Sequence, residues 1–332
     1  LAPLDRFTLA VSFKQTKWFS AVFHASRFVE LYHSATPAGQ AVMLEQATEG
    51  AGDWLRARPR EPGELAPLYT RYQVQSDSLI HHQSTLLLPI ISVPLGCQGC
   101  GRSDAHADPC HFSWCPCGIR VSDALHHPVR DLLVEMLASV YGRPRVRREG
   151  GGAQEWRNYS LFKRPDVVVL DAFGQGRHMI IDVKTVDGSG ATRVTVDHTN
   201  RFALGGLVET ERALALEYTD NGNVPLEQAI GSGSRLICAG VGRHGGLSDG
   251  LLDLLHACAR TRGNVPDATA DALAPAGETF VGVWRHRLSL LVATAASARI
   301  RLNAVAPSNA AAQCAARRAE SEQRFHHRRQ HA

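Results

Sequence analysis

The feature that most constrains how this chain folds is a concentration of cysteines in one short segment. Five of the eight cysteines in the 332-residue chain lie between Cys97 and Cys117. In a chain without a secretion signal, such clustering favours metal binding over disulfide bonds. The segment also has too little apolar content to fold alone, so we expect a bound ion to order it.

The spacing of these cysteines predicts a zinc site with four protein ligands. Cys97 and Cys100 form a C-x2-C turn, on which two thiolates can reach one tetrahedral ion. His111 and Cys115 supply the second half and complete a C-x2-C-x10-H-x3-C pattern. Thiolates and an imidazole suit zinc, whereas magnesium and calcium prefer oxygen. Four filled positions leave none for a catalytic water, so the expected zinc is structural.

Other residues in the segment are rival ligands. His106-x3-Cys110 has the same internal spacing as the second half-site, and Cys117 is a further spare. The remaining cysteines are scattered, and core packing explains them better than metal binding. They are Cys238, Cys258 and Cys314.

Downstream of the cysteines, the periodicity of apolar residues predicts an α/β domain. Leu125–Val140 carries one apolar stripe at helical spacing. Asp166–Leu170 and Met179–Val183 are β-branched and apolar, which predicts adjacent strands of a buried sheet. A helix, a strand and two more helices are expected at Arg201–Tyr218, Arg235–Val241, Gly250–Arg260 and Phe280–Asn303. We therefore expect an α/β fold: a mixed sheet flanked by helices, with a zinc knuckle and a helical N-terminal arm.

These patterns divide the chain into four regions. They are a helical arm and linker (1–96), the zinc knuckle (97–120), the α/β domain (121–262) and a C-terminal helix with a basic tail (263–332). Charged residues at Asp5 and Arg6 argue against a signal peptide. The longest uncharged run, Ser78–Gly101, has an apolar part too short to cross a bilayer. We expect an intracellular protein with no membrane partner.

Two aspartates and a lysine form a second candidate site. Asp166 begins one predicted strand, and alternation puts Asp182 and Lys184 on one face of the next. Two carboxylates at a strand edge can hold Mg²⁺ through oxygen ligands. The Lys184 ammonium can orient an attacking water or help deprotonate it. For a D-x-K pattern taken alone, an ordinary ion pair is the simpler explanation.

A third carboxylate is often needed to fill the shell of such a metal. Glu149, at the end of a possible short strand from Val146, is one candidate, and Glu135, on the flank of the predicted helix, is the other. Basic residues cluster nearby, at Arg143, Arg145, Arg147, Arg148, Arg157, Lys163 and Arg164. Arginines along one edge would contact phosphates without reading sequence. A solvated edge that discourages strand pairing explains them equally well.

The order of these parts resembles the C-terminal region of non-long-terminal-repeat retrotransposon proteins. Those proteins carry a reverse transcriptase followed by a zinc knuckle and a restriction-like endonuclease of the PD-(D/E)XK type. The resemblance covers roughly residues 50–260, and its order and spacing are more specific than any one motif. Besides the knuckle, its carriers are Gly52-Asp53-Trp54-Leu55, His127-Pro128-Val129-Arg130-Asp131, Arg164-Pro165-Asp166 and Asp182-Val183-Lys184.

The resemblance implies a Mg²⁺-dependent endonuclease that nicks target DNA, whose new 3′ end primes reverse transcription. It implies a restriction-endonuclease-like core in the 121–262 region, with Asp166 and Asp182 as magnesium ligands and Lys184 as the catalytic lysine. It favours Glu149 as the third acid. DNA is the expected partner, with RNA as an alternative, and the nucleus the expected location.

The chain also departs from the family. It contains no polymerase Asp-Asp motif and opens at Leu1 without methionine, which fits a truncated or decayed element. The alternative functions are therefore an inactive, zinc-stapled nucleic-acid-binding module and a decayed retroelement fragment.

Overall fold

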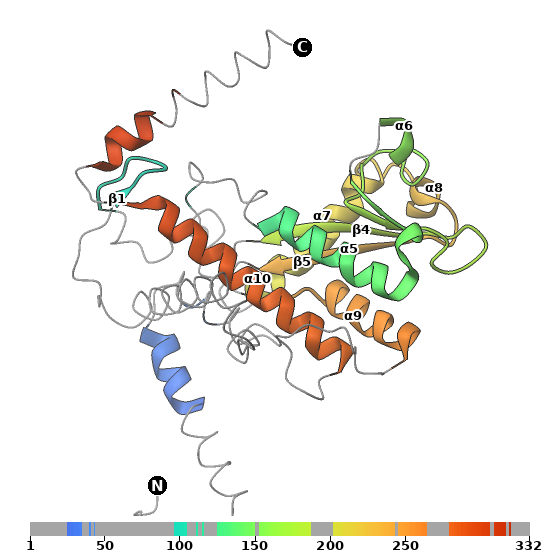
Figure 1. Ribbon diagram of the computed structural model, residues 1–332, viewed down its shortest axis with the longest axis horizontal. Coiled ribbons are helices and arrows are strands. Elements are labelled where there is room, and N and C mark those ends of the chain that lie inside the picture. Colours follow the sequence, from blue (N-terminus) through green and yellow to red (C-terminus); the bar gives the residue numbers. More distant parts are fainter. Residues whose placement is uncertain are drawn as a thin grey trace, which may run out of the picture.

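The computed structural model describes residues 25–34, 96–104, 125–149, 153–186, 202–242, 245–263, 279–305 and 309–316, together with residues 40, 43, 111, 115 and 319. Within these residues, a mixed four-stranded sheet with helices on both faces forms the main body (Figure 1). The expected α/β class with a mixed, helix-flanked sheet is therefore confirmed.

The strand order of the sheet is β2-β3-β4-β5. β3 (Val167–Val169) pairs antiparallel with both of its neighbours, β2 (Val146–Arg148) and β4 (Met179–Val186). On its other side, β4 pairs parallel with β5 (Arg235–Gly242). The parallel pair needs a crossover, and α7 (Phe202–Tyr218) lies in it. β2 is an edge strand, and β4 lies in the interior of the sheet.

The apolar run of β4 reflects burial on both faces. Met179, Ile181 and Val183 face a large apolar cluster, whereas Ile180 belongs to a second cluster on the other side. Alternation along the strand puts Asp182 on the same face as Ile180. β4 therefore places the Asp182 carboxylate on the same face of the sheet as the apolar Ile180 cluster.

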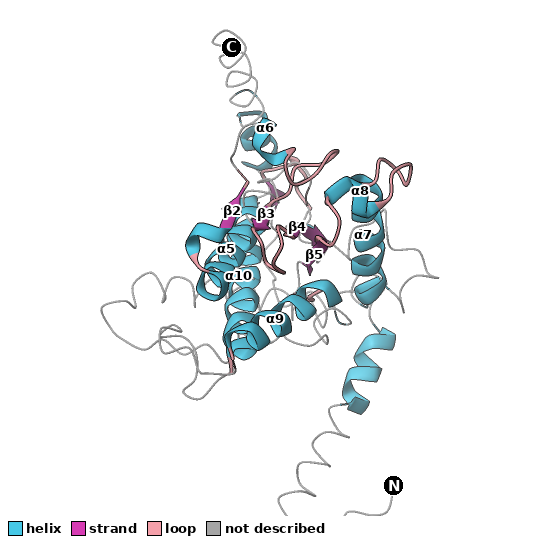
Figure 2. Cartoon of the chain, turned by 90° about the vertical axis from the view of Figure 1, so that its right-hand side faces the viewer, coloured by secondary structure: helices cyan, strands magenta, loops and turns pink. Residues whose placement is uncertain are grey.

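The helices form a layer on each side of the sheet (Figure 2). α5 (His127–Tyr141) and α9 (Asp249–Arg262) cover one face, and α10 (Phe280–Asn303) packs across both. α7 and α8 (Leu226–Ile230) cover the other face through the Ile180 cluster. No described helix has an apolar stretch long enough to span a bilayer.

The remaining short elements are η5 (Arg143–Arg145), α6 (Ala153–Trp156), β1 (Gly96–Cys97) and β6 (Ala304–Val305). β1 pairs antiparallel with β6, directly after α10. Figure 1 shows α10 running from the sheet toward β1. The start of the cysteine-rich segment is thus joined to a segment more than two hundred residues away in sequence, which local spacing does not predict.

α10 has the expected bounds, and the other expected elements occur with ends shifted by one or more residues. β3 is one residue shorter at each end than the expected Asp166–Leu170. α9 begins one residue early, at Asp249, because the Ser248 hydroxyl accepts a hydrogen bond from the Leu251 N–H. In the expected N-terminal arm, residues 25–34 are helical. The loop at 150–152 and nearly all of the basic tail lie outside the described residues.

Candidate functional site

The four predicted zinc ligands come together. Cys97 Sγ lies 3.6 Å from Cys115 Sγ, and Cys100 Sγ lies 3.3 Å from His111 Nε2. One ligand atom from each residue lies within 4.8 Å of the other three. Among the described residues, this is the one group of three or more Cys, His, Asp or Glu side chains gathered so closely.

These separations fit one tetrahedral ion. Zn–S bonds of about 2.3 Å in a tetrahedron put two sulfur ligands about 3.8 Å apart, and a sulfur and a nitrogen slightly closer. Cys97, His111 and Cys115 are buried, so their polar atoms are shielded from water. Hydrogen bonding with Cys115 and with His111 outweighs burial and lowers the pKa of Cys97 to about 3. The cluster can therefore hold a metal ion such as zinc.

The backbone around the cluster is held by both halves of the chain. The Gly101 N–H donates to the Cys97 carbonyl at 2.8 Å, which closes the first turn. Gly101 has φ +81°, and a Cβ there would lie 3.5 Å from Cys314. The Cys314 thiol donates to the Gly99 carbonyl at 3.2 Å. The rival ligands His106, Cys110 and Cys117 lie outside the described residues.

The second candidate site lies where β3 and β4 part. Their register pairs Val167 with Ile181, and its next step puts Asp166 opposite Asp182. Residues directly opposite in such a ladder project to the same face. β3 ends there, and the Asp166 carboxylate accepts the Val183 N–H at 2.7 Å. The two aspartates are thus brought together, as the sequence predicts.

Asp166 is held as an anion by its neighbours. His126 Nε2 lies 3.2 Å from the same Oδ2 that accepts the Val183 N–H. Burial by itself raises the pKa of Asp166, but the His126 hydrogen bond and charge, with the Val183 N–H, lower it overall. That bond to Asp166 in turn raises the pKa of His126.

Asp182 experiences the opposite balance. Its side chain is 5% exposed, and burial followed by the charge of Asp166 raises its pKa. Lys163 Nζ lies 3.2 Å from one carboxylate oxygen, and Lys184 Nζ lies 3.7 Å from the other. The Tyr218 hydroxyl donates a hydrogen bond to Asp182 Oδ2, the oxygen that Lys163 contacts, at 3.2 Å. The aspartate pair is therefore a site of mutual repulsion that two cations offset.

A carboxylate on α7 completes this charge network. Glu217 accepts hydrogen bonds from Lys163 and, at 3.1 Å, from Lys184. Burial lowers the pKa of Lys163, but Glu217 and Asp182 outweigh it and raise the value to about 12. The lysine hydrogen bonds, outweighing burial, lower the pKa of Glu217. Two of the four lysines in the chain thus contact the carboxylates of both Asp182 and Glu217.

The two candidates for a third carboxylate lie elsewhere. The Glu149 N–H donates to the Asp166 carbonyl at 2.7 Å, so its backbone adjoins the site. Its carboxylate, however, pairs with Arg130 at 2.9 Å and Arg164 at 3.6 Å. Glu135 pairs with Arg287 of α10 at 3.3 Å. Neither forms a close group of three with the two aspartates among the described residues.

Sequence reasoning did not assign four residues of this network. His126, Lys163 and Tyr218 each contact one of the aspartates, and Glu217 contacts the two lysines. Glu217 and Tyr218 lie on a helix that periodicity does predict. Tyr218 shares a face with Leu214, four residues earlier, and both are buried against the sheet. The local signal was the pair Glu217-Tyr218 at the end of an apolar face, but the sequence does not say which strand residue that face covers.

No family model, no curated protein and no solved structure matches the chain. The interpretation of the two clusters therefore depends on their geometry and on the spacing of their residues.

We predict that the chain binds one zinc ion and that Cys115→Ala abolishes this binding. The variant removes one of the four clustered candidate ligands. Cys258→Ala removes a cysteine of the apolar core that is not part of this cluster. Elemental analysis after gel filtration should show about one zinc per chain for wild type and Cys258→Ala. Equal zinc content in Cys115→Ala would contradict the assignment.

We predict a pH-dependent stability contribution from the pair of His126 and Asp166. The pKa of His126 is raised, so its contribution is full below 6.5 and is lost as the pH rises through the folded-state value. The pKa of Asp166 is lowered, so its contribution is full above 3.8 and is lost as the pH falls through the folded-state value. The pair should therefore stabilise the fold most between pH 3.8 and 6.5.

The measurement is the free energy of unfolding of wild type and His126→Gln across pH, with zinc retained and no other divalent ion added. The difference should be on the order of 1 kcal/mol in that interval and decrease toward alkaline pH. His256→Gln, an exposed change on α9, is the control. A difference that increases with pH would show that the ion pair is absent.

Proposed function

We propose that this chain is a divalent-metal-dependent endonuclease that hydrolyses phosphodiester bonds of DNA. The observation that supports it best is the pair of buried aspartates at neighbouring strands, where burial and then the charge of Asp166 raise the pKa of Asp182. Two carboxylates that repel each other in a buried place are stabilised by a divalent cation between them. Oxygen ligands favour Mg²⁺ for that position.

The resemblance stated from the sequence agrees with this proposal. A restriction-like endonuclease core has a mixed sheet flanked by helices, and the motif residues Asp166, Asp182 and Lys184 lie together at such a sheet. Under the proposal, the knuckle residues Cys97, Cys100, His111 and Cys115 hold zinc as a structural ion. The chain would act on nuclear DNA as part of a retroelement protein.

Asp166 and Asp182 would hold the catalytic cation. A divalent ion there supplies Lewis-acid stabilisation of the negative charge that develops on the scissile phosphate. The lowered pKa of Asp166 keeps one ligand ionised at neutral pH. The Tyr218 hydroxyl, whose pKa burial and the charge of Asp182 raise, remains protonated and fixes the Asp182 carboxylate.

The lysines position the other reactants. Lys184 Nζ lies between Asp182 and Glu217, where its N–H groups can orient the attacking water. Lys163, whose pKa is raised to about 12, remains an ammonium and can contact the phosphate when substrate displaces Glu217. Glu149 is the third acid that the resemblance implies, and to act so it would have to leave Arg130 and Arg164.

A second candidate function is a nucleic-acid-binding module without catalysis. The favouring observation is that Lys163 and Lys184 already neutralise Asp182 and Glu217 within the chain. A structural ion-pair network has the same composition. Such a module would bind nucleic acid in a salt-dependent way, and Asp182 would not matter for binding.

The test is a plasmid-nicking assay with wild type and Asp182→Asn, each with and without Mg²⁺. Wild type should nick only with the metal, and Asp182→Asn should lower the rate by at least about a hundredfold. Asn conserves the shape of the side chain and removes its charge. Asp253→Asn, on the exposed side of α9, is the matched control and should nick like wild type.

Two outcomes would contradict the proposal. Nicking that persists in Asp182→Asn would assign cleavage to another site or to a contaminant. Salt-sensitive DNA binding without nicking, unchanged in Asp182→Asn, would establish the binding module instead.

A further inference from the structure

A shallow pocket opens at the edge of the sheet, beside β2 and α6. The space between its lining residues is about 300 Å³, a volume that includes open solvent. Its floor includes Val168 of β3 and Pro165, and its walls come from β2 and from the segment around α6. Neither the zinc cluster nor the residues that contact Asp182 line it.

One wall of the pocket is aromatic. Trp156, at the end of α6, and Tyr159 both line it, and both are partly exposed. Tyr159 is held edge-on against the His178 ring, with centroids 5.5 Å apart. The Arg157 guanidinium lies 5.8 Å from the Trp156 ring centroid. Partly exposed aromatic faces of this kind are the surfaces on which nucleic-acid bases stack.

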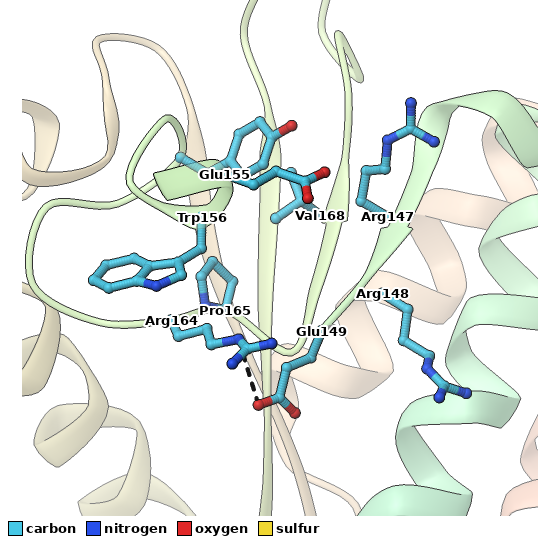
Figure 3. A pocket seen from close by; sticks show the side chains of 9 residues that line it. Arg147, Arg148, Glu149, Glu155, Trp156, Arg164, Pro165 and Val168 are labelled. Atoms are coloured by element: carbon cyan, nitrogen blue, oxygen red, sulfur yellow. Dashed lines mark ion pairs between the residues drawn. The ribbon is translucent and has the colours of Figure 1, made fainter. Parts of the chain in front are cut away.

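The facing wall is cationic. Figure 3 shows Trp156 on one side of the pocket and Arg147 and Arg148 on the other. Arg148 pairs with Asp131 at 3.1 Å, whereas the Arg147 guanidinium has no carboxylate partner among the described residues. A guanidinium in that position can bind a phosphate without first giving up an ion pair.

The acidic groups of the pocket offset only part of this charge. Glu149 is neutralised by Arg130 and Arg164, as the dashed ion pair in Figure 3 shows for Arg164. Glu155 is exposed. The lining as a whole has three arginines and two glutamates, a net positive charge.

The pocket adjoins the aspartate pair along the chain. Arg164 and Pro165 line it, and Asp166 follows directly. The Glu149 N–H donates to the Asp166 carbonyl at 2.7 Å, so the strand that forms one wall also touches the aspartate. A nucleic-acid strand whose phosphate lies at Asp166 and Asp182 would therefore pass next to this pocket.

We propose that the pocket binds one unpaired nucleotide of the strand being cut, with its base on Trp156 and its phosphate on Arg147. A base in a duplex is stacked between its neighbours and cannot reach such a pocket, so the site selects a strand that is open beside the cleaved bond. This inference rests on the proposed function for its placement next to the scissile phosphate.

The test measures binding alone, by fluorescence anisotropy of labelled single strands on the full zinc-loaded chain without Mg²⁺. One strand carries bases, and a second of equal length has abasic sugars and the same phosphates. Trp156→Ala should weaken binding of the base-bearing strand at least about fivefold and leave the abasic strand unchanged. Trp156→Phe, which retains an aromatic face, should recover most of the affinity. Parallel DNA and RNA strands identify the sugar that is accepted.

Matched controls separate the pocket from general effects. Phe162→Ala removes another exposed aromatic of the same segment, outside the pocket, and should not change binding. Arg147→Ala should weaken binding of both strands and reduce the salt slope by about one, whereas Arg260→Ala, an exposed change on α9, should do neither. Unchanged zinc content and circular dichroism show that each variant is folded.

The inference is overturned if Trp156→Ala binds the base-bearing strand as wild type does, or if it weakens the abasic strand equally. Its failure is distinguishable from failure of the proposed function. If Trp156→Ala weakens binding of the base-bearing strand alone but wild type does not nick plasmid, the pocket assignment stands and the endonuclease proposal fails. If wild type nicks plasmid but Trp156→Ala does not change binding of the base-bearing strand, the endonuclease proposal stands and the pocket assignment fails.

Discussion

The antiparallel pairing of β3 with β4 is the contact on which the candidate site depends. It sets Asp166 opposite Asp182, and it does so at the residue where β3 leaves the sheet. Because the β4 backbone continues beyond that point, its Val183 N–H is available to the Asp166 carboxylate. A shift of one residue in this register would send Asp182 into the apolar layer of Ile181 and separate the two acids.

Electrostatics explains why the site can persist without substrate. Burial and then the charge of Asp166 oppose the ionisation of Asp182 and raise its pKa. His126 offsets the charge of Asp166, and Lys163 and Lys184 offset that of Asp182 and Glu217. Under the proposed function, a divalent cation would take over part of this compensation. The lysines would then be free to contact water and phosphate.

Much of this arrangement follows from local sequence pattern. Alternation along β4 places Asp182 and Lys184 on one face, and the four clustered ligands fit the C-x2-C and H-x3-C spacings. These features depend on residues a few positions apart, whose relative geometry the backbone fixes. The helix and strand order follows from apolar periodicity for the same reason.

The remainder depends on contacts between distant segments. His126 reaches Asp166 across forty residues, and Lys163 reaches Glu217 across fifty-four. The pairing of β1 with β6 likewise has no local signal, because each strand has only two residues. Glu149 illustrates the converse: its place in the chain suggested a metal ligand, but Arg130 from α5 holds its carboxylate.

The central claim is that Asp166 and Asp182 together hold one divalent cation, and a manganese titration tests it most directly. Mn²⁺ substitutes for Mg²⁺ at oxygen-ligand sites, and electron paramagnetic resonance measures the free ion. The account predicts one bound Mn²⁺ per zinc-loaded chain, with affinity reduced at least about tenfold in Asp166→Asn and in Asp182→Asn. Absence of binding, or equal binding by wild type and both variants, would contradict it.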